Sequence, residues 1–374
     1  MRKEDLPGVS LIVPAYNEEK DISKTIKSLL KLNYPKDRLE IIVVDDGSTD
    51  RTYEVVKKFE KYGVKVFKKK RGGKSRAINF GTKKAKFEIV GVVDSDTTLE
   101  RNSLLNCVKC FDSEDVASVT SRILQRRKKK ILERWQDIEL KIIAYIRKLF
   151  ENLNIITATP GPLSLYRKKV LTKIGGFDKN CILEDNEIAW RLIYHGYRIR
   201  MAYDAKVYTN MPDTFKRWFL QRVRWGVGGL QIITKYIGTF MKRHPVGTFL
   251  LPSWILGYVF STIGISLFFY TFFYTLYMNL SYYLLSFKYG TNPFVFSLDF
   301  NPDFLFFYGI ILFFLSLIII VKVLGEYKKR ASLFDLVTFI FIYLVFFPII
   351  SFYSIFKFII LRKKLKIKPV WLTK

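Results

Sequence analysis

Hydrophobic positions divide the chain into two regimes. Up to about residue 235, short apolar runs alternate with polar stretches, whereas long runs with almost no charge begin at Thr248. The first pattern is typical of a globular domain. The second predicts membrane-spanning helices, because about 20 apolar residues cross a bilayer as a helix. We therefore divide the chain into a head of residues 1–235 and a membrane domain of residues 236–374.

Short apolar runs in the head predict buried strands, and the stretches between them have helical character. The runs cover 9–14, 40–45, 64–67 and 88–93, and the expected helices cover 19–31, 48–62 and 74–85. Parallel strands buried on both faces have continuous Val/Ile runs of this kind. Strands that alternate with helices form βαβ units and an open parallel sheet. The fold class is therefore α/β, with a mostly parallel, Rossmann-like sheet.

Further elements follow in the second half of the chain. We expect a strand at 163–166, helices at 131–152, 184–195 and 215–236, and apolar segments at 249–285, 304–324 and 336–361. The 131–152 helix has an apolar face with Trp135 and Leu149, which would suit either core packing or a membrane surface. We favour core packing. The third apolar segment contains Pro348, which can break a helix, so this segment either re-enters the membrane or runs along the cytosolic interface, with a plain third span as the alternative.

Acidic pairs follow two of the predicted strands. Asp45-Asp46 and Asp94-Ser95-Asp96 each lie directly after an apolar run, and open parallel sheets bind ligands at the carboxyl ends of their strands. A lone D-x-D is common in surface turns, but two acidic pairs at strand ends indicate a site. Carboxylate oxygens suit Mg²⁺ or Mn²⁺. We therefore expect one of these metals at Asp94 and Asp96.

Three further groups carry candidate chemistry. Lys74 follows two glycines at a helix start, where it is either an anion seat or a solvated residue. Glu184-Asp185 either caps a helix or supplies a base whose pKa is raised by a shared acidic pocket. The third group lies on one helical face by its i, i+3, i+4 spacing and offers a guanidinium for a diphosphate and an indole platform for a sugar; it contains Gln221, Arg224 and Trp225.

The order of these motifs resembles that of membrane-bound, inverting family 2 glycosyltransferases with the GT-A fold, of the cellulose-synthase-like and hyaluronan-synthase-like kind. The matching stretches are Pro14-Ala15-Tyr16-Asn17-Glu18, Val44-Asp45-Asp46-Gly47-Ser48, Asp94-Ser95-Asp96, Leu183-Glu184-Asp185 and Gln221-Arg222-Val223-Arg224-Trp225. The resemblance covers roughly residues 8 to 235. The expected fold is thus a GT-A nucleotide-diphospho-sugar transferase domain followed by C-terminal transmembrane helices.

The resemblance implies a role for each matching residue. The loop and the first acidic pair, with Ala15, Tyr16, Glu18, Asp45 and Asp46, would hold the uridine of a UDP-sugar. The D-x-D would hold the sugar diphosphate and the metal, and Lys74 would face the phosphates. Asp185 would be the general base beside Glu184, although Leu183 stands where the family usually has Thr. Gln221 and Trp225 would line the acceptor site, and Arg224 would face the leaving diphosphate.

Composition excludes some classes of function. The net charge of +29, from 62 Lys plus Arg against 33 Asp plus Glu, first suggests nucleic acid. No nucleic-acid motif accompanies the charge, and basic residues beside membrane spans are retained in the cytosol and attract anionic lipids. We therefore expect a lipid bilayer as partner and no nucleic acid. Cys107 and Cys110 form a lone C-x-x-C that we interpret as packed helix residues, because half a zinc site has no partner half.

Three functions remain open from the sequence. The first is a processive polysaccharide synthase, and because three spans make a thin channel wall, a channel would need a homo-oligomer. The second is a single transfer to a lipid or polyprenyl-phosphate acceptor, and the third is a catalytically inert nucleotide-binding protein. The start of the chain, Met1 to Ser10, is polar and lacks a signal-peptide pattern. The expected location is the cell membrane, with several spans and a cytosolic catalytic domain.

Overall fold

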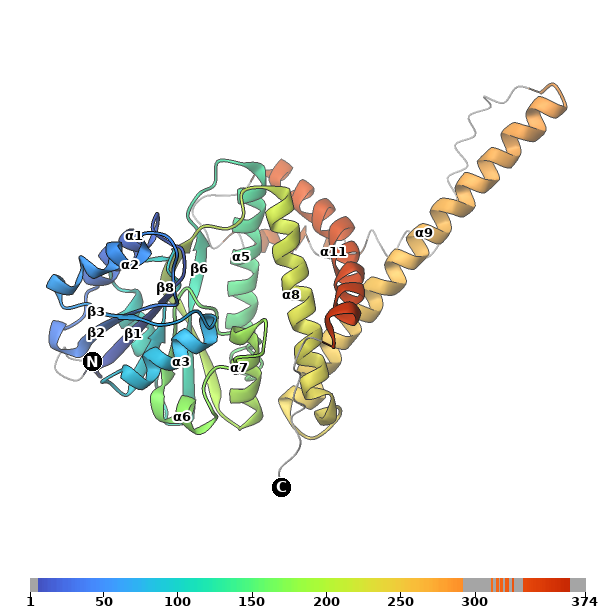
Figure 1. Cartoon of the computed structure of the whole chain (residues 1–374). Coiled ribbons are helices and arrows are strands. Elements are labelled where there is room, and N and C mark those ends of the chain that lie inside the picture. Colours follow the sequence, from blue (N-terminus) through green and yellow to red (C-terminus); the bar gives the residue numbers. More distant parts are fainter. Residues whose placement is uncertain are drawn as a thin grey trace.

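The computed structural model describes residues 6–291 and 332–363, together with single positions between 311 and 325. Within them, an eight-stranded sheet has the order β3-β2-β1-β4-β7-β6-β8-β5. Its strands are β1 (Val9–Ala15), β2 (Leu39–Asp45), β3 (Lys65–Lys68), β4 (Ile89–Val92), β5 (Thr98–Leu99), β6 (Val116–Gln125), β7 (Ser164–Arg167) and β8 (Arg198–Thr209). Figure 1 shows helices on both faces of this sheet and two long helices beyond it.

Most of the helices surround the sheet, and the last two form the C-terminal part. They are α1 (Ile22–Leu30), α2 (Thr52–Lys57), α3 (Lys74–Lys84), α4 (Ser103–Val108), α5 (Ile131–Phe150), α6 (Lys168–Lys173), α7 (Glu184–Tyr194), α8 (Phe215–Tyr236), α9 (Leu251–Lys288) and α11 (Leu333–Leu361). The predicted helices 74–85, 184–195 and 215–236 agree with α3, α7 and α8 to within one residue. The helix expected at 48–62 is shorter, since α2 ends at Lys57.

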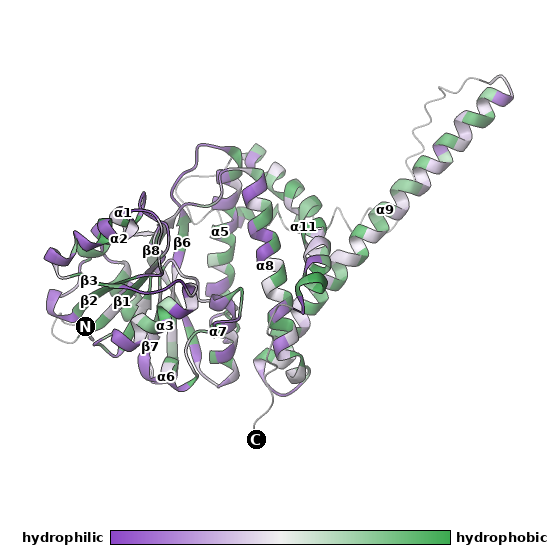
Figure 2. Ribbon diagram, in the orientation of Figure 1, coloured by the Kyte–Doolittle hydropathy of each residue, from purple (hydrophilic) through white to green (hydrophobic). Residues whose placement is uncertain are grey.

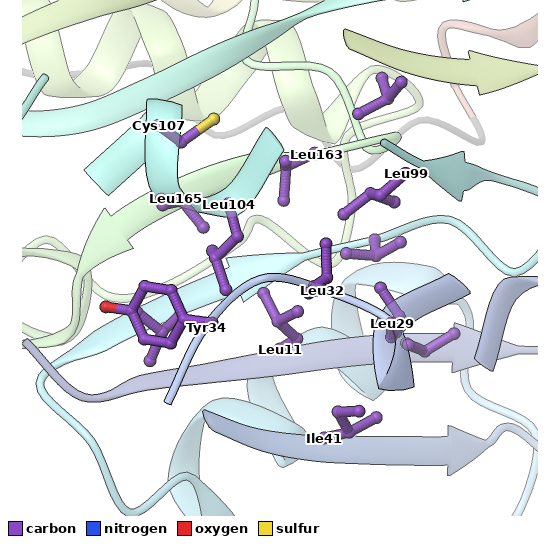
Figure 3. Packing of buried hydrophobic residues seen from close by; sticks show 14 of the residues in the cluster. Leu11, Leu29, Leu32, Tyr34, Ile41, Leu99, Leu104, Cys107, Leu163 and Leu165 are labelled. Atoms are coloured by element: carbon purple, nitrogen blue, oxygen red, sulfur yellow. The ribbon is translucent and has the colours of Figure 1, made fainter. Parts of the chain in front are cut away.

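The four strands predicted from their apolar runs form the parallel part of the sheet. β3, β2, β1 and β4 pair in parallel, with Val9 opposite Leu39 and Ile89. Every residue of β1 is buried, so its side chains alternate between two core clusters. Figure 3 shows one of them, in which Leu11 packs with Leu29 and Leu104. This packing brings the carboxyl ends of β1, β2 and β4 to one edge of the sheet.

The other half of the sheet differs from the mostly parallel arrangement that the sequence predicts. β7 runs antiparallel to both β4 and β6, and β5 runs antiparallel to β8, whereas β6 and β8 pair in parallel. β6 and β8 were not predicted from apolar runs. β6 is buried along its whole length, but it includes Ser118, Thr120 and Ser121, and β8 alternates arginines with apolar residues. The sheet is therefore mixed.

Helix α5 packs with a different face from the one that its apolar stripe predicts. Toward the sheet it buries Gln136, Leu140 and Ala144. The apolar stripe instead meets α11, where Ile138 clusters with Leu336 and Phe339. The expectation of core packing therefore holds for only part of the stripe. Leu149, at the far end of that stripe, is 60% exposed.

Two helices are long and apolar enough to cross a membrane, among the residues that the structure describes. They are Val246–Lys288 and Leu333–Leu361. Figure 1 shows that α9 extends away from the head, and Figure 2 shows many hydrophobic residues along its ribbon. Most of the predicted segment 304–324 lies outside the described residues. α11 is continuous through Pro348, so the break considered at this proline is absent.

Helix α11 is attached to the head along much of its length. Near its start, the Arg134 guanidinium on α5 bonds Asp335 at 3.0 Å, and the Trp135 indole N–H donates to Thr338 Oγ1 at 2.9 Å. Farther along, Ile350 and Phe358 cluster with α8 residues. This side-by-side packing agrees with a helix that runs along the membrane interface. The orientation of α11 in a membrane stays a prediction.

Helix α8 accepts α11 because small residues face it. A Cβ on Gly226 would lie 2.3 Å from Ser354 Oγ on α11. We therefore expect Gly226→Leu to lower the free energy of unfolding by about 1–3 kcal/mol, as overpacking does, measured by thermal unfolding of the purified protein in detergent. Gly264→Leu on α9 is the matched control, because no heavy atom lies within 4 Å of its built Cβ. Equal stability of the two variants would contradict this packing.

Candidate active site

A cavity of about 920 Å³ lies at the carboxyl edge of the parallel strands. Its wall includes the start of α3, the loop after β4, the start of α7 and one face of α8, and it continues to residues of α5, α9 and α11. It brings together predicted site residues that are far apart in the sequence: Lys74, Asp94, Asp96, Glu184, Asp185, Gln221, Arg224 and Trp225. Eight of the predicted site residues thus line one cavity, and their roles stay predictions.

Lys74 connects two of the predicted motifs. Its ammonium group lies 2.6 Å from Asp94 Oδ1 and 3.2 Å from Glu184 Oε1. Burial lowers the pKa of Lys74, but these carboxylates outweigh burial and raise the pKa above its ordinary value. Lys74 therefore stays cationic and sits between the D-x-D and the start of α7.

The Asp94 carboxylate lies directly against the backbone of residue 161. The Asp94 amide donates to the Gly161 carbonyl at 3.0 Å, and a Cβ on Gly161 would lie 2.3 Å from Asp94 Oδ1. Any larger residue at 161 would displace the carboxylate. The Pro160-Gly161-Pro162 segment thus forms a wall that fixes where Asp94 points.

Two more carboxylates crowd the same edge of the sheet. Burial raises the pKa of Asp96, and the charge of Asp94 adds to the increase. Burial likewise raises the pKa of Glu18 to about 7, followed by the charges of Asp96 and other nearby carboxylates. This repulsion shows excess negative charge where a cation would be stabilised.

The donor set fits a divalent cation that also binds a diphosphate. Asp94 and Asp96 offer hard oxygen ligands of the kind that Mg²⁺ and Mn²⁺ prefer. The described residues contain no group of three His, Cys, Asp or Glu side chains arranged to hold a metal. A metal at Asp94 and Asp96 would therefore need further oxygens, which the diphosphate of a bound nucleotide could supply.

Asp185 begins helix α7 and faces the cavity. Its backbone carbonyl accepts hydrogen bonds from Thr159 N and Oγ1, each at 3.1 Å, and its Oδ1 accepts from the Asn186 amide at 2.9 Å. Burial raises the pKa of Asp185 to about 6, with the neighbouring Glu184 charge next in effect and Lys74 opposing. A carboxylate with this pKa can accept a proton near neutral pH.

Leu183 has a packing role where a hydroxyl residue was expected. It is 7% exposed, and a Cβ on Gly228 would lie 2.4 Å from its Cγ. The side chain thus fixes the start of α7 against α8. Through this contact, the start of α7, which carries Asp185, packs directly on α8, which carries the Gln221–Trp225 segment.

The residues expected around the nucleoside lie next to the cavity rather than in its wall. Asp46 is 4% exposed and accepts hydrogen bonds from the backbone N–H of Gly72 at 3.0 Å and of Gly73 at 2.6 Å, and it pairs with Lys69. Asp46 thus holds the glycine loop that precedes Lys74. Asp45 is buried, with its Oδ1 bonded to Ser48.

Tyr16 forms a further part of this neighbouring region. Its ring lies 4.2 Å from the Arg71 guanidinium, and it follows Ala15 at the end of β1. An aromatic ring beside the strand end offers a flat face on which the nucleobase of a nucleotide could stack. None of Ala15, Tyr16, Glu18, Asp45 and Asp46 is among the residues that line the cavity.

The Gln221–Trp225 segment divides its residues between the cavity and the interior. Gln221, Arg224 and Trp225 line the cavity, and the Arg224 side chain is exposed. Arg222 is only 3% exposed and pairs with Glu139 on α5. Sequence reasoning assigned no role to Arg222 or Glu139. Their only signal was a charged residue within an amphipathic helix, which usually indicates a solvated face.

Cys107 and Cys110 lie outside the cavity wall, whereas Cys181 is among the residues that line it. Cys107 is buried in the core, and burial raises its pKa well above the ordinary value. Cys110 lies just after α4, and its thiol contacts the Asn106 carbonyl at 3.4 Å. These positions agree with the interpretation of the pair as packed residues.

Comparisons with known proteins agree with this geometry. Residues 10–175 match the model of Glycosyl transferase family 2. This match covers a little under half of the chain. The fold also resembles that of the mannosyltransferase PcManGT from Pyrobaculum calidifontis, with a TM-score of 0.54 and 24% identity over 67% of this chain and 70% of that one. This likeness shows that the chain has the GT-A glycosyltransferase fold.

Curated relatives extend the sequence match beyond that domain. A probable glycosyltransferase, YdaM of Bacillus subtilis, is 34% identical over 252 residues, which are 64% of this chain and 59% of that protein. The poly-beta-1,6-N-acetyl-D-glucosamine synthase of Staphylococcus epidermidis is 30% identical over 66% of this chain and 61% of its own length. This chain thus spans about three fifths of the length of these relatives.

A metal at Asp94 and Asp96 gives a direct binding prediction. We expect Asp96→Ala to weaken Mn²⁺-dependent nucleotide binding by roughly ten-fold or more, because even residues that only orient a metal ligand cost about ten-fold. Isothermal titration of UDP and GDP with and without Mn²⁺ measures this. Asp37→Ala is the control, since the Asp37 side chain is 81% exposed and distant in sequence from the cavity loops. Metal-stimulated binding that survives in Asp96→Ala would refute the assignment.

Proposed function

We propose that this protein is a membrane-bound, inverting glycosyltransferase that moves a sugar from a nucleotide-diphosphate sugar to a growing polysaccharide. The observation that carries the proposal is the single cavity that joins Lys74 and the D-x-D to Asp185 and Trp225. The printed name of the Staphylococcus relative, a polysaccharide synthase, supports a saccharide acceptor. The family resemblance favours UDP as the nucleotide, although the similar mannosyltransferase was solved with GDP-Man and Mn²⁺.

The residues divide the chemical work between donor and acceptor. The acceptor hydroxyl oxygen attacks the anomeric carbon from the face opposite the diphosphate, and the bond from that carbon to the diphosphate oxygen breaks. The hydroxyl proton passes to the Asp185 carboxylate. The leaving diphosphate takes the bonding electrons, and Lys74 and Arg224 stabilise its charge. A divalent cation held by Asp94 and Asp96 would supply further positive charge to that diphosphate.

Lys74 has a specific part in this scheme. Without donor, its ammonium is neutralised by Asp94 and Glu184. A diphosphate that enters the cavity would bring competing oxygens to the same cation, and Asp94 would compete less for the ammonium while it holds a divalent cation. Lys74 can then turn from carboxylates to phosphate without crossing the cavity.

Membrane attachment completes the proposal. The two apolar helices and the basic composition support a bilayer as partner, with the head on the cytosolic side of the cell membrane. A homo-oligomer would build the wall of a polymer channel from several copies. The presence of Asp94, Asp96, Glu184 and Asp185 in the cavity wall supports a catalytic protein over an inert nucleotide-binding one.

One observation favours a second acceptor, a lipid or polyprenyl phosphate. Trp254 and Tyr258 of α9 line the cavity, as does Ile146 of α5, which is 39% exposed. The aromatic rings of Phe150 and Phe249 lie 6.1 Å apart close to this rim. An apolar tail could therefore leave the cavity sideways between α5 and α9. Arg147, in the same wall, would meet the phosphate of such an acceptor.

The raised pKa of Asp185 predicts the pH profile of transfer. The base works in its deprotonated form, so we expect kcat/KM to fall about ten-fold per pH unit below about pH 6 and to level off above it. An ordinary Asp would hold the rate constant down to about pH 4. Initial rates from pH 4.5 to 8.5 in a constant-ionic-strength buffer measure this.

Removal of the base tests the same assignment. Asp185→Asn keeps the shape of the side chain and should lower transfer by about two to four decades, with nucleotide affinity unchanged. Asp178→Asn is a control, since Asp178 pairs with Lys235 away from the cavity wall. Near-normal turnover in Asp185→Asn would exclude Asp185 as the base.

The products decide between the two acceptors. We would incubate the purified full chain with Mn²⁺, a panel of nucleotide sugars and lipid extract, and identify products by mass spectrometry. A series of oligosaccharides that differ by one sugar supports the polysaccharide synthase. A single sugar on an organic-soluble lipid supports the second candidate. Absence of turnover with every nucleotide sugar would refute both.

A further inference from the structure

Arg222 is the buried residue of the Gln221–Trp225 segment. It is 3% exposed, whereas its neighbour Arg224 faces the cavity with an exposed side chain. A buried guanidinium is costly unless it is paired and hydrogen-bonded. The two arginines of this segment therefore have different roles, and the residues that contact Arg222 indicate what its role is.

The partners of Arg222 come from two other helices. Its Nη2 donates to Glu139 Oε2 on α5, and the Tyr343 hydroxyl on α11 donates to the same oxygen at 2.7 Å. Glu139 is 14% exposed, so this charged cluster is largely removed from solvent. One carboxylate oxygen of Glu139 thus connects Arg222 on α8 with Tyr343 on α11, a helix that lies far from α8 in the sequence.

The same guanidinium contacts both residues expected to hold the acceptor. Its Nη1 donates to Gln221 Oε1 at 2.9 Å, which sets the orientation of that amide. Its Cζ lies 4.1 Å from the centre of the Trp225 ring. A desolvated cation over an indole face is a strong and directional contact. Arg222 therefore holds the indole on one side while the cavity lies on another.

We propose that Tyr343, Glu139 and Arg222 are positioning residues that hold Gln221 and Trp225 in the acceptor part of the cavity. Helix α11 is then a component of the active site as well as an apolar helix. Phe347 and Ile350 of α11, which line the cavity, agree with this role. The inference rests on the proposed glycosyl transfer and does not depend on which acceptor is correct.

The chain of contacts predicts which step suffers when it is weakened. Among the described residues, no hydrogen bond or ion pair joins Gln221 or Trp225 to Lys74 or Asp94, so these two donor-binding side chains would keep their places when the network loosens. Transfer to an acceptor needs the indole in one place, whereas hydrolysis by water does not. A positioning role therefore separates transfer from hydrolysis, and a general loss of folding lowers both.

Tyr343→Phe removes a single hydroxyl and is the first test. We expect kcat/KM for the acceptor to fall roughly ten-fold, because hydrogen bonds to charged groups are the stronger kind. Donor hydrolysis without acceptor and nucleotide affinity should stay within about two-fold of the original protein. Tyr353→Phe is the matched control on the same helix: its ring lies 6.0 Å from Phe219 and it has no contact with Glu139 among the described residues.

A second pair of variants keeps the test decisive if one protein is unstable. Glu139→Gln should reduce acceptor transfer more than Tyr343→Phe does, because it leaves the Arg222 charge without its counterion. Combining both changes should add little to Glu139→Gln alone, since the hydroxyl acts through that carboxylate.

Three results would overturn the proposal, and the third of them would also refute the proposed function. Unchanged acceptor transfer in Tyr343→Phe would show that the hydroxyl has no positioning role. Equal losses of transfer and hydrolysis would show a structural effect only. No hydrolysis and no transfer by the original protein with any nucleotide sugar would refute the proposed function, and this inference would fail with it.

Discussion

Attraction between the Lys74 ammonium and two carboxylates holds the candidate site together. Asp94 belongs to the loop after β4 and Glu184 to α7, and both lie within 3.2 Å of this one cation. Without it, the carboxylates that line the cavity would repel one another across a partly buried space. Burial raises the pKa of Asp96 and of Asp185, and the charges of neighbouring carboxylates add to both increases. The glycine loop that presents Lys74 depends in turn on Asp46.

The parallel half of the fold could be predicted because burial on both faces leaves an unmistakable pattern. β1 and β2 consist almost wholly of buried apolar residues. The other half could not be predicted in the same way, since Ser118 and Thr120 occupy buried positions of β6 and interrupt the apolar run. The helix predicted at 131–152 begins where α5 begins and ends two residues beyond it. Its packing was predicted only in part, because a helix between a sheet and a second helix has two buried sides.

The candidate site shows a similar division. Acidic pairs at strand ends follow a general rule of α/β sheets, so Asp94, Asp96 and Lys74 could be placed together from the chain alone. The contacts that support Trp225 could not be predicted from the sequence, because Tyr343 and Glu139 are 204 positions apart and neither belongs to a motif. Long-range polar contacts of this kind depend on how whole helices cross, and local sequence patterns do not encode that crossing.

In the proposed membrane attachment, helix α9 would couple the cavity wall to the thickness of the bilayer. The segment Val246–Lys288 has 43 residues, which is about 65 Å of helix, whereas a bilayer's hydrocarbon core is about 30 Å thick. Its first turns, with Trp254 and Tyr258, form part of the cavity wall. A helix longer than the membrane adjusts by tilting as the membrane thickens or thins. A bilayer that takes up α9 would therefore reshape the acceptor wall through hydrophobic mismatch, so that lipid chain length becomes a variable of catalysis.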